Sequence, residues 1–402
     1  MRISGPLAER EYRLLFAGRT VSTVGNAIAP IGLAFAVLSL TGSRADLGYV
    51  LAARSVPQIV FLLAGGVWAD RLPRHRVMVV SSLVSGTSQG AVGALLLSGH
   101  ARIWELAVFG AVNGTSSAFF FPANTGVVPQ TVPASLLQQA NALLRLSLNA
   151  TNIGGAAIGG ALVAATSPGT AIVIDGVSFA LGAVFIGAMR LPPGLRMQGS
   201  HFWADLHDGW REFRSRTWLW AIVAQFSIVN AAEVGAINVL GPTVAKAHLG
   251  GAGAWGVVLA AQATGLVLCG LFMLRFRPRR ILLVATFAIF PMALFPLSLA
   301  RPLPLATVIA AAFLAGFFVE IFGVLWDVAM QHNIPADRLS RVSSYDALGS
   351  WVFVPIGLAA AGPLADAFGT RQTLIGAAVL VVVPTALVLL SRDVRTLQRP
   401  AR

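Results

Sequence analysis

The stretch PLATVIAAAFLAGFFVEIFGVLWD occupies residues 304–327, and only Glu320 and Asp327 within it carry charge. A helix needs about 20 mostly apolar residues to cross a bilayer, so this stretch predicts a transmembrane helix. Apolar runs of similar length recur on both sides of it. We therefore expect twelve spans, near residues 14–40, 47–69, 77–98, 103–125, 137–165, 168–190, 217–243, 252–274, 281–300, 304–327, 340–364 and 372–391.

The composition also indicates a membrane protein. With 56% hydrophobic and 11% charged residues, the chain carries more apolar surface than a soluble core can hide from water. Its formal net charge is +13, but the arginines are spread over many connectors and form no aromatic-rich basic patch, which argues against nucleic acid as a partner. The only cysteine, Cys269, rules out an intramolecular disulfide.

The charge distribution predicts the orientation in the membrane. Most of the 29 basic residues lie in the terminal segments and in the connectors after even-numbered spans. Because positive loops stay in the cytoplasm, we expect both termini to be cytoplasmic in a multi-pass protein of the plasma (inner) membrane.

The spans divide into two sets of six. The longest polar connector predicts an N-terminal bundle at 1–190, a cytoplasmic amphipathic linker at 191–216 and a C-terminal bundle at 217–402. VPASLLQQAN at 132–141 and IPADRLSRVS at 334–343 share Pro, Ala and Leu in register, as expected for a duplication in which both halves keep the same orientation. The sequence thus predicts an all-α membrane protein of two pseudo-symmetric six-helix bundles.

The sequence GGVWADRLPRHR at 65–76 ends the second span with glycines, an acid and a run of positive charge. Such a cluster can lock two helices in one conformation and release them in another. The alternative is that the arginines only fix topology. The gating residues of this hypothesis are Gly66, Asp70, Arg71, Arg74 and Arg76.

This motif resembles the signature loop of the major facilitator superfamily. The resemblance extends over nearly the whole chain, through FAGRTVSTVGNAI at 16–28, FFFPANTGVVPQTVPASLLQQANALL at 119–144 and IPADRLSRVSSYDALGSWVFVPIGLAAAGPLADAFG at 334–369. It implies the drug:proton antiporter branch, which includes macrolide, tetracycline and enterobactin exporters. Two positions depart from that branch: Gly155 stands where a proline is usual in span five, and Asn26 stands where many relatives carry an acid.

Ionisable groups inside spans are costly and usually face a cavity or a partner. Glu233 and Glu320 are the candidates for proton coupling, because each lies well inside its span with no basic residue within one helical turn; the alternative is a neutral packing role. We expect Arg54 and Asp175 to pair across helices, and Asp327 and Asp346 to cap helices or pair with Arg341. The full set of cavity or charge-pair candidates is Asn26, Arg54, Arg145, Asp175, Asp327 and Asp346.

Other features of the spans predict packing or a cavity wall. Gly154, Gly155, Gly159 and Gly160 are expected to let helices approach closely. Several aromatic side chains either line a cavity for large amphiphilic molecules or face lipid and pack: Phe119, Phe120, Phe121, Phe317, Phe318, Phe322 and Trp326. The histidines lack metal-ligand spacing, and no phosphate-binding GK[ST] loop occurs, so no metal, cofactor or ATP site is expected.

The sequence therefore predicts a secondary active transporter, not an enzyme. We expect proton-coupled efflux of drug-like or secreted small molecules by alternating access, with a small-molecule substrate, protons and the lipid bilayer as partners and a monomeric state. Two alternatives remain open from the residues: a proton-coupled importer of the same fold, and a non-transporting membrane scaffold or sensor.

Overall fold

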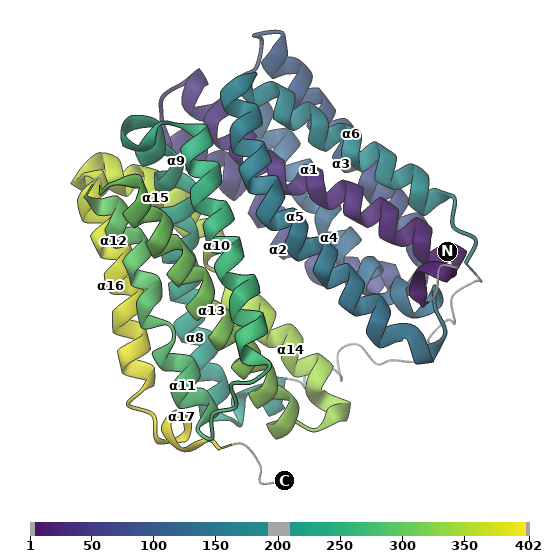
Figure 1. Cartoon of the computed structure of the whole chain (residues 1–402), viewed down its shortest axis with the longest axis vertical. Helices are drawn as coiled ribbons and strands as arrows, with labels where there is room; N and C mark the ends of the chain where they lie inside the picture. The colour runs from purple at the N-terminus through teal and green to yellow at the C-terminus, as the bar shows by residue number, and fades with distance from the viewer. Residues whose placement is uncertain (1–4, 192–209, 302, 399–402) are drawn as a thin grey trace. The chain divides into compact units, whose positions relative to one another are not determined.

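The computed structural model describes residues 5–191, 210–301 and 303–398, with the side chains of 63–71, 125–126, 134, 138, 336–337 and 340–341 left out. Over these residues the chain is helical and contains no strand, only one isolated bridge between Arg280 and Gln398 (Figure 1). This is the expected response to lipid, because a helix satisfies every backbone hydrogen bond within its own segment.

Each of the twelve predicted spans coincides with a helix or a run of helices. Eleven of these within the described residues are long and apolar enough to cross a membrane, and the remaining one is α2. The main helices are α1 (Arg10–Leu40), α2 (Arg44–Arg71), α3 (Arg74–Leu97), α4 (Ile103–Val127), α5 (Leu137–Ala165), α6 (Pro168–Gly187), α8 (Thr217–Gly235), α9 (Gly241–Val244), α10 (Ala252–Met273), α11 (Ile281–Phe287), α12 (Leu294–Ala300), α13 (Leu305–Asn333), α14 (Ala336–Trp351), α15 (Val354–Phe368), α16 (Thr370–Val388) and α17 (Arg392–Thr396).

Three predicted single spans are interrupted in the structure. The ninth divides into α11 and α12 around a short 3-10 turn at Phe290–Ala293 that contains Pro291. The eleventh divides into α14 and α15. The seventh continues from α8 through π-helical turns at Ala236–Leu240 and Ala245–Leu249. Proline explains the first break, because it lacks the N–H that an α-helix needs.

The chain forms two compact units. The first holds the described residues up to 191 together with Gly250–Ala260, and the second holds those from 210 to Leu249 and from Ala261 onward. The opening turns of α10 therefore belong to the first unit, although the sequence analysis assigns residues 217–402 to one bundle. The division into bundles at 1–190 and 217–402 stays a prediction.

In the first unit, α1 and α3 both pack on α6, α2 packs on α4, and α5 packs on α1. Tyr12 is fully buried and donates from its hydroxyl to the Ala140 carbonyl at 2.6 Å, which ties the start of α1 to α5. Close approach of helices is built on small residues. Gly155 and Gly159 of α5 face Ala27 and Ile28 of α1, whereas no other group lies within 4 Å of an ideal Cβ at Gly154.

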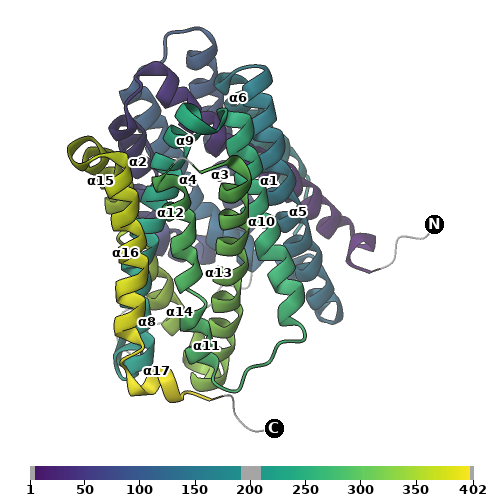
Figure 2. The same ribbon diagram turned by 60° about the vertical axis from the view of Figure 1, so that its left-hand side comes forward.

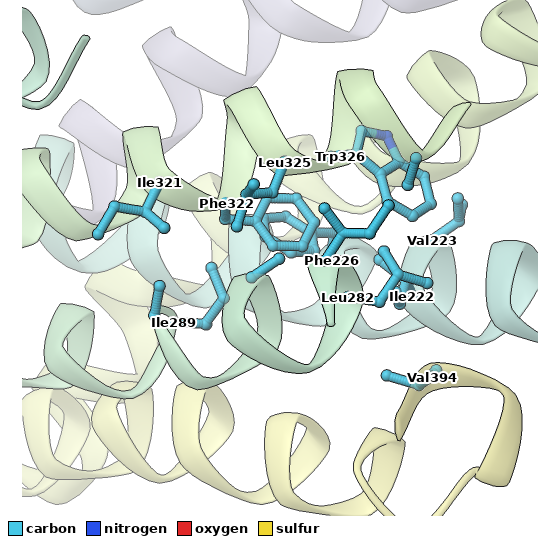
Figure 3. Close-up of a cluster of buried hydrophobic side chains, with 14 of the residues drawn as sticks. Ile222, Val223, Phe226, Leu282, Ile289, Ile321, Phe322, Leu325, Trp326 and Val394 are labelled. Atoms are coloured by element: carbon cyan, nitrogen blue, oxygen red, sulfur yellow. The ribbon is translucent and has the colours of Figure 1, made fainter. Parts of the chain in front are cut away.

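In the second unit, α8 packs against α14, α15 and α16, and α13 packs against α11 and α12 (Figures 1 and 2). The core is aromatic: Phe226 of α8 stacks on Phe322 of α13 with ring centroids 4.1 Å apart, and Trp326 continues the stack (Figure 3). Phe322 and Trp326 are buried, so of the two roles considered for them, the structure gives packing. Cys269 of α10 is also in this core and is 0% exposed.

Candidate functional site

Among the residues that the structure describes, the first unit buries the carboxyl group of Asp175 on α6, which is 1% exposed. Gln89 of α3 donates from Nε2 to its Oδ2 at 2.5 Å, while Oδ1 has no hydrogen-bond donor among the described residues. An ideal Cβ at Gly25 of α1 would lie only 2.6 Å from Oδ1. Asp175 is therefore held between α3 and α1 by one hydrogen bond and tight packing.

Arg54 lies near this acid but does not bridge to it directly. Its positive charge acts on Asp175, yet no ion pair within 4.0 Å joins them in the described part of the chain. Instead, Arg54 lines a small enclosed cavity together with Gln89 and Asn113. Asn113 is buried, and neither of its side-chain polar atoms has a partner there. The predicted Arg54–Asp175 pair is thus a longer-range electrostatic interaction and not a direct ion pair.

The second unit buries the carboxyl group of Glu233 on α8, which is 8% exposed. Neither Oε1 nor Oε2 finds a hydrogen-bond donor among the residues that the structure describes. Two helical turns earlier, on the same face of α8, Gln225 donates to the Thr385 hydroxyl of α16 at 2.7 Å. A buried carboxylate without a partner is strongly disfavoured, so this environment favours the protonated acid.

The helix changes its hydrogen bonding just beyond Glu233. The α-helical pattern of α8 ends at Gly235, and the π-helical turn Ala236–Leu240 begins at the next residue. Single π-helical turns inside helices are frequent at functional sites, where they mark a local change of register. The unpartnered acid and the irregular turn occupy the same part of the seventh span.

The remaining acidic candidates differ from Glu233. Glu320 of α13 is half-buried and lies close enough to Cys269 for an electrostatic interaction. Asp346, in the middle of α14, accepts a hydrogen bond from Trp326 Nε1 at 3.0 Å and one from the Ser350 hydroxyl. It is not at a helix end. Asp327 is exposed, and the side chain of Arg341, its suggested partner, lies outside the described set.

A polar stripe runs along the exposed face of α5. Its members recur at helical spacing and are Asn141, Arg145, Asn149 and Asn152, all exposed. Asn26 of α1 is exposed too, and donates to the Ser22 carbonyl of its own helix at 3.0 Å. Polar side chains within membrane helices face a water-filled cavity or a partner rather than lipid. Of this set, only Arg145 and Asn26 were predicted from the sequence, although the stripe recurs every three or four residues, from Asn141 through Arg145 and Asn149 to Asn152.

Three residues of the proposed gating motif, Gly66, Asp70 and Arg71, have side chains outside the described set. Arg74 is half-buried and Arg76 is exposed, both in the first turn of α3.

Among the packing glycines, Gly160 lies against Gly256 in the same unit, with an ideal Cβ at Gly160 only 2.8 Å from the Gly256 Cα.

A second charge cluster, which was not predicted from the sequence, consists of Glu212, Arg216 and Arg338. Glu212 precedes α8, and Arg216 donates to its Oε1 from Nε at 3.0 Å and from Nη2 at 2.6 Å. Arg338 of α14 donates to Oε2 at 2.7 Å. The hydrogen bonds from Arg216 and Arg338 hold the pKa of Glu212 below its ordinary value. The cluster joins the start of α8 to the start of α14.

A multi-span helical chain with acids buried inside its membrane helices and a polar stripe along one span has the features of a membrane transporter. The chain matches the family description "Major Facilitator Superfamily" over residues 15–352. It belongs to the major facilitator superfamily.

Relatives with assigned names agree in length with this chain. It is 27% identical over 378 residues to the multidrug efflux pump Tap of Mycolicibacterium fortuitum, covering 90% of each chain. It is 22% identical over 381 residues to macrolide efflux protein A of Streptococcus pyogenes, covering 92% of this chain and 93% of that protein.

Solved structures share the fold. The nucleoside transporter NupG superposes with a TM-score of 0.75 at 13% identity, covering 94% of this chain and 98% of that one. A bacterial homologue of the lysosomal transporter Spinster gives 0.71 at 16% identity, covering 99% and 100%. At these identities the likeness shows the fold alone.

Proposed function

We propose that this chain exports amphiphilic drug-like or secreted small molecules in exchange for protons by alternating access. Two efflux proteins are similar to it over about nine-tenths of its length. The single observation that carries proton coupling is Glu233, a buried carboxyl group without a hydrogen-bond donor among the described residues.

Glu233 is suited to carry the proton because no hydrogen-bond donor among the described residues stabilises its ionised form. Its charge state therefore depends on whether water reaches it. Buried without a hydrogen-bond donor among the described residues, the carboxyl group favours its neutral, protonated form. When a conformational change admits water to α8, hydration stabilises the ionised carboxylate and the proton is released. The π-helical turn that follows Glu233 is the element we expect to rearrange. Glu320, which is half-buried, is the second candidate.

The polar stripe of α5 is the proposed contact for the substrate. Arg145, Asn149 and Asn152 offer hydrogen bonds on an exposed helix face, where an amphiphile can place its polar groups. Replacing Asn149 and Asn152 by leucine should raise the KM for transport, with little change in the amount of folded protein. Gating by Asp70, Arg71, Arg74 and Arg76 remains part of the proposal.

The orientation and assembly follow from the sequence argument. We propose a monomer in the plasma (inner) membrane with both termini in the cytoplasm. The positive-inside rule supports this orientation, because most basic residues lie in the terminal segments and in the connectors after even-numbered spans. A cysteine-accessibility test with an impermeant reagent on intact cells checks this: the connector at 274–280 should be unreactive and the one at 249–251 reactive.

Transport itself is tested with the full chain reconstituted into lipid vesicles. A pH gradient is imposed, and the movement of a macrolide and of a cationic dye is followed with and without an uncoupler. Proton-driven movement opposite to the proton flux supports export. Movement in the same direction as the protons would establish an importer instead, and the absence of any gradient-dependent movement across a broad substrate panel would favour a scaffold or sensor.

A further inference from the structure

Three arginines converge on one pocket at the end of the second unit. Arg280, Arg392 and Arg395, together with Thr396 and Gln398, line a cavity of about 340 Å³. Arg280 directly precedes α11, whereas the other residues belong to α17 and the segment after it. The pocket is distinct from Glu233, from the α5 stripe and from the Glu212 cluster.

The pocket is built by the fold and does not depend on chance contact between loose side chains. Arg280 and Gln398 form an antiparallel backbone bridge that joins its two walls. Val394 of α17 is fully buried in the same core cluster as Leu282 of α11 (Figure 3). In Figures 1 and 2, α17 lies beside α11. These contacts hold the arginines together although they come from distant parts of the sequence.

Within the described part of the chain, no ion pair offsets the positive charge of this pocket. None of the three arginines forms an ion pair with any described acid, including Asp393 within α17. Among the described residues, the Arg395 guanidinium donates from Nη2 to the Leu390 carbonyl at 3.4 Å. Three like charges around one cavity repel each other, and a bound anion removes that cost. Guanidinium groups present paired N–H donors whose geometry matches phosphate oxygens.

The surface next to the pocket distinguishes between a soluble phosphate and the phosphate of a lipid headgroup as the ligand. Leu387 and Leu390, at the end of α16, are 60% and 72% exposed, and the hydrogen bond from Arg395 to the backbone carbonyl of Leu390 brings the end of α16 next to the arginines. A soluble phosphate has no apolar group that could pack against these leucine side chains. A phospholipid would lay an acyl chain along it while its headgroup enters the pocket.

We propose that Arg280, Arg392 and Arg395 bind the phosphate headgroup of an acidic membrane phospholipid. The site rests on the chain being a membrane protein, not on efflux or proton coupling. Basic residues near a bilayer attract anionic lipid with about 1 kcal/mol each. Neutralising all three should therefore weaken lipid retention on the order of a hundredfold.

The test uses native mass spectrometry of the full chain in detergent containing phosphatidylglycerol or phosphatidylcholine. The pocket variant carries Arg280→Gln, Arg392→Gln and Arg395→Gln. The matched control carries Arg275→Gln, Arg277→Gln and Arg279→Gln, which removes the same charge from exposed positions of the adjacent connector. Equal melting temperatures of both variants in phosphatidylcholine verify that each is folded.

We expect wild type and control to retain phosphatidylglycerol in preference to phosphatidylcholine, and the pocket variant to lose this preference. Equal losses in the two variants would show a diffuse charge effect and overturn the proposal. Inorganic phosphate is added as a separate arm. If it binds the pocket and displaces phosphatidylglycerol completely, the site takes a soluble anion and the lipid assignment fails; continued lipid retention supports it.

Discussion

Each of the two units buries a carboxyl group inside a membrane helix, and the two groups have different surroundings. In the first unit, Asp175 accepts a hydrogen bond from Gln89, with Arg54 close enough to act on it electrostatically. In the second, Glu233 is buried, and neither of its carboxyl oxygens has a donor among the described residues. A bonded acid costs energy to disturb, whereas an unbonded acid can gain or lose a proton as its exposure to water changes. Burial alone therefore does not identify a coupling residue.

The largest effect should come from neutralising the two acids in turn. Each pH unit across a membrane can sustain about a tenfold substrate ratio for one-for-one exchange. We expect Glu233→Gln to reduce that ratio to about one in proteoliposomes, because the amide cannot carry a proton. Asp175→Asn, the matched neutralisation in the other unit, should leave it near the wild-type value. The opposite pattern would assign coupling to Asp175.

Removing the hydrogen-bond donor Gln89 tests whether this bond distinguishes Asp175 from Glu233. Gln89→Leu leaves Asp175 without its hydrogen bond, as Glu233 is already, and should lower the free energy of unfolding by about 1–3 kcal/mol. Thermal unfolding in detergent measures this. In an Asp175→Leu background the same change should cost much less, since both partners are then apolar. Equal costs in both backgrounds would mean that the hydrogen bond contributes little.

The packing around Asp175 offers a sharper test of why it is fixed. A Cβ at Gly25 would lie 2.8 Å from the Asp175 Cα, so Gly25→Ala must push α1 away from α6. We expect a loss of about 1–3 kcal/mol in unfolding free energy. Gly154→Ala is the control, because no other group lies within 4 Å of its Cβ position. If the two variants have the same melting temperature, the close approach of α1 and α6 does not contribute measurably to stability.

The smallest effect concerns Glu212, an acid whose ionised form is stabilised by arginines. Its pKa is below the ordinary value of 4.5 in the folded chain. The ionised form therefore stabilises the protein above about pH 4.5 and loses this contribution as the pH falls through the folded value. Glu212→Gln should cost about 1 kcal/mol at pH 7, since Arg338 is half exposed. Melting curves of both proteins should converge in acid; a constant difference would exclude ionisation as the cause.

Much of the fold could be predicted from the sequence, because lipid leaves few alternatives to long apolar helices. All twelve predicted spans coincide with helices, and the major facilitator resemblance is confirmed by the family match. The interruptions were not predicted. A proline was nevertheless visible in two of them: Pro291 within the ninth span, and Pro242 within the seventh, between its two π-helical turns.

The candidate site was predictable only in part. Asp175 and Glu233 stood out because ionisable groups are rare in spans. Whether each has a partner depends on residues far away in sequence: Gln89 is 86 positions from Asp175, and Arg338 is 126 positions from Glu212. A neutral glutamine in an apolar span gives no indication of which helix it will face. Those relations arise only from helix packing.

The buried position of Cys269 has a practical consequence. It is the only cysteine in the chain and is completely enclosed in the core of the second unit. A thiol-reactive probe should therefore not react with the folded wild-type protein. Engineered cysteines at exposed sites such as Asn149 could then carry fluorophores or spin labels without background, giving distances that report the opening and closing of the transporter in its native bilayer.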